Sequence, residues 1–80
     1  MRRGYIVWIV TEGSLAGMVG TIQETDRFFP ANNPQDQWHS MGRFAFEGYT
    51  GTPLQPGANV SFDISPSNPD YADAATIVPI

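Results

Sequence analysis

Aromatic rings and arginines are the side chains through which this chain could bind a ligand. The 80-residue sequence has two Trp, three Tyr, five Phe and one His, four arginines and neither lysine nor cysteine. Rings can stack on nucleic-acid bases, and guanidinium groups can contact phosphates. For each residue the alternative is a structural role, either in the core or as solvated surface charge. The candidate binding residues are Trp8, Arg27, Phe28, Trp38, His39, Arg43 and Phe44.

The remaining polar residues do not favour an enzyme or a metal site. His39 is the single histidine, and no neighbour in the sequence supplies the nucleophile and orienting acid that a catalytic triad needs. Zinc requires three or four nitrogen, sulfur or oxygen ligands, and a chain with one histidine and no cysteine offers a poor set of them. Glu24 and Asp26 could act as paired carboxylates, but a polar turn between strands explains both. We therefore expect no catalytic activity, no cofactor and no metal.

Charge and cysteine content limit the possible partners and compartment. The net charge of −4 argues against strong electrostatic binding of a polyanion, because counterion release requires a basic surface. Stacking on rings remains possible, since it does not depend on net charge. The absence of cysteine favours a reducing cytoplasm. Arg2 and Arg3 precede an apolar stretch of only about six residues, too short for a signal peptide or membrane span, so we expect no membrane partner.

The two ends of the chain predict the architecture. Residues 4–10 and 74–80 are apolar and β-branched, which is typical of strands. An unpaired apolar edge promotes aggregation, so both strands must be paired or enclosed, which favours a small closed or nearly closed β-barrel. Alternation in the first strand places Tyr5, Val7 and Ile9 on one face and Ile6, Trp8 and Val10 on the other.

The segments between the ends predict further short strands in one domain, residues 1–80. We expect strands at 15–23, at 27–29, at 58–64 and from about Ala74 to Val78. In the strand at 58–64, Val60, Phe62 and Ile64 should face the core, and Ser61 and Asp63 should face out. Residues 38–47 form either a strand or a packed loop, and their rings together with Tyr49 form either a second small core or a binding surface. No amphipathic helix is evident, so the pattern indicates an all-β sandwich or barrel.

Three segments in this order resemble the cold-shock domain. Gly4-x-Ile6-x-Trp8-Ile9 is similar to the opening strand of that family. Residues 54–64 resemble its segment of leucine, glycine and valine followed by Ser-Phe-Asp or Ser-Phe-Glu. Residues 74–80 resemble its closing strand, so the resemblance extends from residue 4 to residue 80. The chain is suspected to be a divergent member of this family.

The resemblance implies a five-stranded antiparallel OB-fold barrel, here with an enlarged loop between strands 3 and 4. It also implies that single-stranded RNA or DNA stacks on an open face formed by the first three strands. Trp8 matches the stacking tryptophan of strand one, and Phe28 matches the exposed aromatic position of the second ribonucleoprotein motif. The first motif is degenerate, because Val19 and Thr21 stand where the family has rings.

Two hypotheses of function follow. The first is weak binding of single-stranded nucleic acid, with low sequence specificity, through Trp8, Phe28 and rings of the loop. The second is a protein-interaction or self-associating module, such as a homodimer, whose barrel has lost its nucleic-acid face. Retention of Trp8 and Phe28 favours the first hypothesis, and the degenerate first motif with the lack of lysine favours the second.

Overall fold

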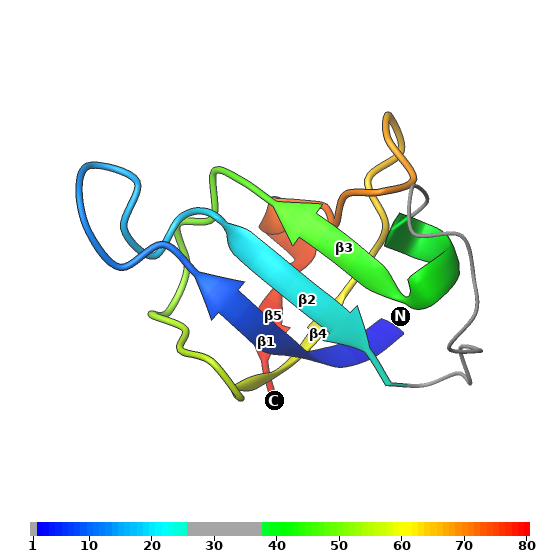
Figure 1. Ribbon diagram of the computed structural model, residues 1–80, viewed down its shortest axis with the longest axis horizontal. Coiled ribbons are helices and arrows are strands. Elements are labelled where there is room, and N and C mark those ends of the chain that lie inside the picture. Colours follow the sequence, from blue (N-terminus) through cyan, green and yellow to red (C-terminus); the bar gives the residue numbers. More distant parts are fainter. Residues whose placement is uncertain (1, 26–37) are drawn as a thin grey trace.

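The computed structural model describes residues 2–25 and 38–80, and in them five antiparallel strands form one sheet. The strands are β1 (Arg2–Ile9), β2 (Gly20–Glu24), β3 (Arg43–Phe46), β4 (Asn59–Phe62) and β5 (Val78–Pro79), in the order β3-β2-β1-β4-β5 (Figure 1). Two short 3-10 helices, η1 (Trp38–Met41) and η2 (Ala74–Thr76), are the other regular elements. The described residues contain no α-helix, so the all-β expectation is confirmed.

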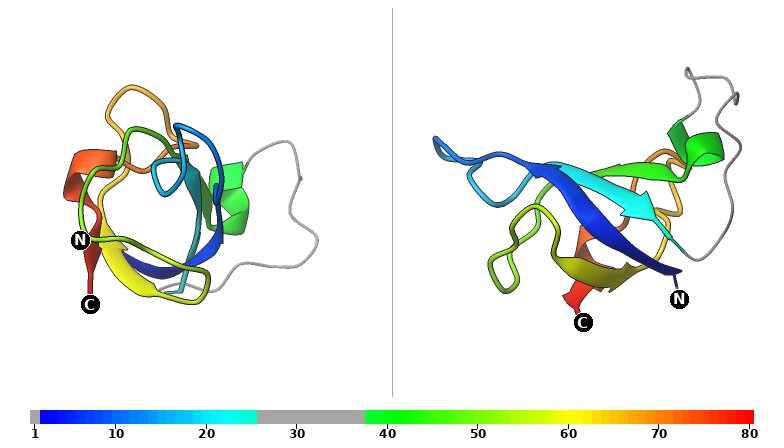
Figure 2. Two further views of the ribbon diagram at one scale, coloured as in Figure 1. Left: turned by 90° about the vertical axis from the view of Figure 1, so that its left-hand side faces the viewer. Right: turned by 60° about the horizontal axis from the view of Figure 1, so that its bottom comes forward.

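The sheet curls around a common interior without closing into a continuous ladder (Figure 2). Residues 70–72 connect its two sides through a parallel bridge from Ala45 to Tyr71 and an antiparallel bridge from Ile64 to Ala72. The amide of Ala45 donates to the carbonyl of Asp70 at 3.0 Å, and the amide of Ala72 donates to the carbonyl of Ala45 at 2.8 Å. This segment therefore satisfies backbone groups of the β3 edge that would otherwise be unpaired.

The interior is filled by side chains from four strands. Phe44 and Phe62 pack with their ring centroids 5.4 Å apart, and Phe46 meets Tyr49 edge-on at 6.1 Å. Burying one such ring contributes about 1.5–3 kcal/mol. The inward orientation expected of Phe62 and its neighbour Val60 is confirmed. Ser61 is also buried, contrary to expectation, because β4 lies between β1 and β5 in the sheet. The fully buried large side chains are Ile6, Ile22, Phe44, Phe46, Val60 and Phe62.

A β-bulge breaks the alternation that we expected along β1. Ile6 pairs with Ile22 but Trp8 pairs with Thr21, so Val7 is an extra residue on β1. A bulge of this kind re-aims the side chains that follow it. Ile6 and Ile9 are consequently both buried, and the expectation that Ile6 and Trp8 share a face is wrong.

The second strand begins five residues later than expected. Residues 15–19 form a turn, and β2 starts at Gly20. Gly13 and Gly17 have φ values of 86° and 76°, a left-handed backbone that glycine adopts easily and that does not fit a strand. Gly20 itself has a packing role, because a Cβ there would lie 2.5 Å from the carbonyl oxygen of Trp8.

The last strand is shorter than expected, and the strand expected at 27–29 stays a prediction. The expected strand at 27–29 lies outside the described residues, and the third described strand is β3. The enlarged loop expected between strands 3 and 4 depends on the strand at 27–29, so it stays a prediction. Residues 74–76 form η2, whose first turn is capped by the Asp73 carboxylate accepting from the amide of Ala75 at 3.2 Å. In the last segment Val78 and Pro79 pair with β4, and the amide of Ile80 donates to the carbonyl of Asn59 at 3.0 Å.

Candidate nucleic-acid interface

The outer face of β1, β2 and β3 carries two exposed rings. Tyr5 and Trp8 are 38% and 54% exposed, and they lie on β1 on either side of the bulge. Tyr5 pairs with Gln23 of β2, which pairs with Arg43 of β3, so these three residues form one row across the sheet. This row combines a ring, an amide and a guanidinium group on adjacent strands.

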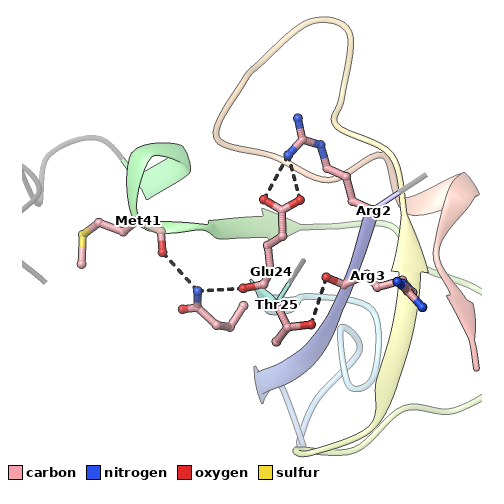
Figure 3. A network of polar contacts seen from close by, with 6 residues as sticks. Arg2, Arg3, Glu24, Thr25 and Met41 are labelled. Carbon is pink, nitrogen blue, oxygen red and sulfur yellow. Dashed lines mark hydrogen bonds and ion pairs between the residues drawn. The ribbon is translucent and has the colours of Figure 1, made fainter. Parts of the chain in front are cut away.

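The guanidinium group of Arg43 is oriented by Gln23. Arg43 Nε donates to Gln23 Oε1 at 3.0 Å. The amide nitrogen of Gln23 donates in turn to the carbonyls of Met41 at 3.1 Å and Glu24 at 3.2 Å (Figure 3). Because Gln23 is anchored at the end of η1 and on β2, it holds the Arg43 side chain in a defined direction on an exposed surface. A guanidinium group placed in this way can form a paired contact with a phosphate.

Arg2, by contrast, pairs with a carboxylate inside the sheet. Arg2 donates to both carboxylate oxygens of Glu24, at 2.8 and 3.0 Å, and the Glu24 side chain is 1% exposed (Figure 3). The Arg2 guanidinium also lies 6.0 Å from the centroid of the Phe44 ring. Arg2 therefore neutralises a buried charge and is not a phosphate contact. The register of β1 on β2 brings the two residues together. The pair could not be recognised in the sequence, because the sequence does not reveal this register.

The expected role of Phe44 is wrong. We expected it to contact nucleic acid, but it is completely buried against Phe62. Phe46 and Tyr49 are 1% and 3% exposed, so the three rings belong to the main core and form neither a second core nor a binding surface. Burial raises the pKa of the Tyr49 hydroxyl, which donates to the carbonyl of Thr52 at 2.5 Å. No ring of β3 faces outward.

His39 has an acid partner that the sequence did not reveal. Its Nδ1 lies 2.7 Å from Asp70 Oδ1, and its backbone amide donates to the same oxygen at 3.1 Å. These hydrogen bonds lower the pKa of Asp70, with the side-chain bond contributing most. The pair attaches η1 to the loop before Tyr71. Among the residues that the structure describes, no cluster of three or more His, Cys, Asp or Glu could hold a metal ion.

The other candidate residues cannot be placed in the same detail. Arg27 and Phe28 lie outside the described residues, so their expected roles in nucleic-acid binding stay predictions. Trp38 is described by its backbone, which begins η1. Tyr5 was not among the candidates, and it joins Trp8 on the outer face because of a bulge that no sequence pattern predicts.

The fold defines the class of this protein, which is all-β with one five-stranded antiparallel sheet. No family model, no curated protein and no solved structure matches this chain. In residues 2–25 and 38–80, no helix has the length and apolarity needed to cross a bilayer.

Proposed function

We propose that this protein binds single-stranded nucleic acid weakly, by stacking of bases on Trp8 and Tyr5. The supporting observation is the bulge of β1, which leaves both rings exposed on the outer face of the sheet. Three residues of extended chain span about 10 Å, somewhat less across a bulge. That separation suits two bases, one on each ring, better than a single base between them.

The proposed fold is a five-stranded OB-type barrel that resembles the cold-shock domain. Its support is the meander of β1, β2 and β3, the antiparallel pairing of β1 with β4, and the bridging of the β3 edge by residues 70–72. An OB-type barrel is a partly open Greek-key barrel that binds single strands on one face. In the proposed barrel, the exposed rings of β1 would belong to this face.

Stacking would provide most of the affinity, with little help from charge. The chain carries a net charge of −4, and Arg43 is the arginine that the sheet register places in the row with Tyr5. The logarithm of affinity for a single strand falls by about 0.7 for each phosphate contact per tenfold rise in salt. One contact by Arg43 therefore predicts a slope of log affinity against log salt near −0.7, which is much shallower than that of a basic protein with many phosphate contacts.

Titration of labelled oligo-dT and oligo-U, followed by fluorescence anisotropy, tests the proposal. Loss of one stacking ring costs about 1–3 kcal/mol, so Trp8→Ala should weaken binding by about 5- to 150-fold. Leu15→Ala is the matched control, because Leu15 is equally exposed at 54% but aliphatic, and it should bind like the wild type. Tryptophan quenching in a Trp38→Phe background reports on Trp8 alone. Absence of binding at about 100 μM strand, or an equal loss in both alanine variants, would refute the proposal.

The alternative function is a protein-interaction or self-associating module. Leu15, Val78 and Ile80 are aliphatic and 54%, 52% and 66% exposed, which favours contact with another apolar surface. Size-exclusion chromatography with light scattering tests self-association. A concentration-dependent dimer that Val78→Asp abolishes, in a protein that does not bind oligonucleotides, would establish the alternative.

A further inference from the structure

A polar hollow lies on a different part of the molecule from the rings of β1. Its volume is about 420 Å³, within the range of small-molecule sites. Polar lining comes from the residue that follows β3 and from the connection between β4 and β5. The polar lining residues are Glu47, Ser65, Ser67, Asn68, Tyr71 and Asp73.

Backbone pairing gives this hollow a defined shape. The parallel bridge from Ala45 to Tyr71 sets the residues after β3 alongside those after Tyr71. The amide of Ser65 donates to the carbonyl of Tyr71 at 2.8 Å, which closes the loop between them. Ser65 Oγ lies 3.1 Å from Ser67 Oγ and accepts from the amide of Ser67 at 3.3 Å. The hydroxyl groups are thus held on a loop that is pinned to the sheet.

The lining has the chemistry to accept hydrogen bonds from a cation. Two carboxylates, from Glu47 and Asp73, belong to separate segments of the chain, and no described arginine lines the hollow. Asp73 caps η2 with Oδ1, and a carboxylate has a second oxygen for another donor. A guanidinium group offers five donors in one plane and stacks on aromatic rings, which suits a lining that includes Tyr71.

We propose that this hollow binds a guanidinium group, with Glu47 and Asp73 as its anionic partners and Tyr71 as the ring against which it lies. The guanidinium group can come from a free guanidino compound or from an arginine side chain of a polypeptide. The site is separate from the outer face of β1, so it does not depend on the proposed nucleic-acid binding. The net charge of −4 adds to the attraction of any cation.

Two-dimensional NMR titration of the full chain with agmatine and with the peptide acetyl-Gly-Arg-Gly-amide tests the site. We expect saturable shifts of amides in residues 65–74, with dissociation constants in about the millimolar range for ligands of this size. Glu47→Gln should weaken binding about two- to fivefold at low salt. Asp73→Asn should do the same while its side-chain oxygen still caps η2.

Glu12→Gln is the matched control, since it removes one exposed carboxylate from the turn after β1. Unchanged binding by this variant supports the site, and an equal loss would show non-specific attraction to a negative protein. Putrescine that binds as tightly as agmatine would overturn the preference for guanidinium. Shifts only with agmatine identify a free compound as the ligand, and tighter binding of the peptide identifies an arginine side chain. Absence of saturable shifts at about 50 mM of either probe would overturn the proposal.

Discussion

Replacement of Arg2 by Met should strongly destabilise the protein, although residue 2 lies next to the chain terminus. The substitution keeps an apolar stem near Phe44 but removes both hydrogen bonds to the Glu24 carboxylate, at 2.8 and 3.0 Å. Glu24 is 2% exposed, so its charge would remain inside the sheet without Arg2. An ionised group that is buried in this way loses hydration, and without Arg2 the protein replaces less of it.

The expected cost follows from the burial of the two partners. Removing one member of a fully buried ion pair costs about 3–5 kcal/mol. The Arg2 side chain is 33% exposed, so water reaches one side of the pair, and we expect about 2–4 kcal/mol. A chain of 80 residues has a total stability of about 4–12 kcal/mol. The melting temperature should therefore fall by about 10–25 °C.

Urea unfolding of three variants separates this effect from the general loss of an arginine. Arg43→Met is the matched control, because Arg43 is exposed and hydrogen-bonded to Gln23, and it should cost no more than about 1 kcal/mol. The double variant Arg2→Met with Glu24→Gln should be more stable than Arg2→Met alone, since a neutral amide is cheaper to bury than a carboxylate. Equal costs for the two single arginine variants, or no recovery in the double variant, would refute the reasoning.

Two further predictions concern the core and the response to acid. Phe62→Ala should cost about 3–5 kcal/mol in urea unfolding, because Phe62 is 1% exposed and packs on Phe44, and a variant of wild-type stability would contradict the inward orientation of β4. The pKa of Asp70 is lowered by its hydrogen bonds to His39, so the stabilisation that it provides is present above its unfolded pKa near 3.8 and is lost as pH falls through the lower folded value. Asp70→Asn should thus be less stable than the wild type at pH 7, with the difference shrinking as the pH falls below about 3.8; a difference independent of pH would show that the carboxylate charge contributes nothing.

Patterns of period two were sufficient to identify the strands with the simplest pairing. β4 was predictable because Val60 and Phe62 alternate with polar residues and both face the core. The apolar run that became β1 was also recognisable, since it is short and rich in β-branched and aromatic residues. These elements follow local rules, so the all-β class could be inferred without knowledge of the partners in the sheet.

Features that depend on strand register or on the sign of the backbone φ angle could not be predicted in this way. The second strand was placed too early because the apolar residues of 15–19 hide a turn with Gly17 at φ 76°. The last strand was predicted to be longer than it is, because Ala74–Thr76 suits a strand and a 3-10 helix equally. Capping by Asp73 stabilises the 3-10 helix. Arg43–Phe46 alternates clearly, yet only pairing with β2 distinguishes this strand from a packed loop.

The composition of the candidate site depends on one extra residue in β1. Without the bulge, alternation from Ile6 would turn Trp8 toward the core, where Phe44, Phe46 and Phe62 already fill the interior. With the bulge, the register shift exposes the tryptophan while Ile9 returns to the core. Arg2 is engaged by Glu24 inside the sheet, so the two rings and Arg43 are the groups of this face that a ligand can contact. A site built in this way should bind weakly, tolerate salt and discriminate little between sequences, as stacking on rings does.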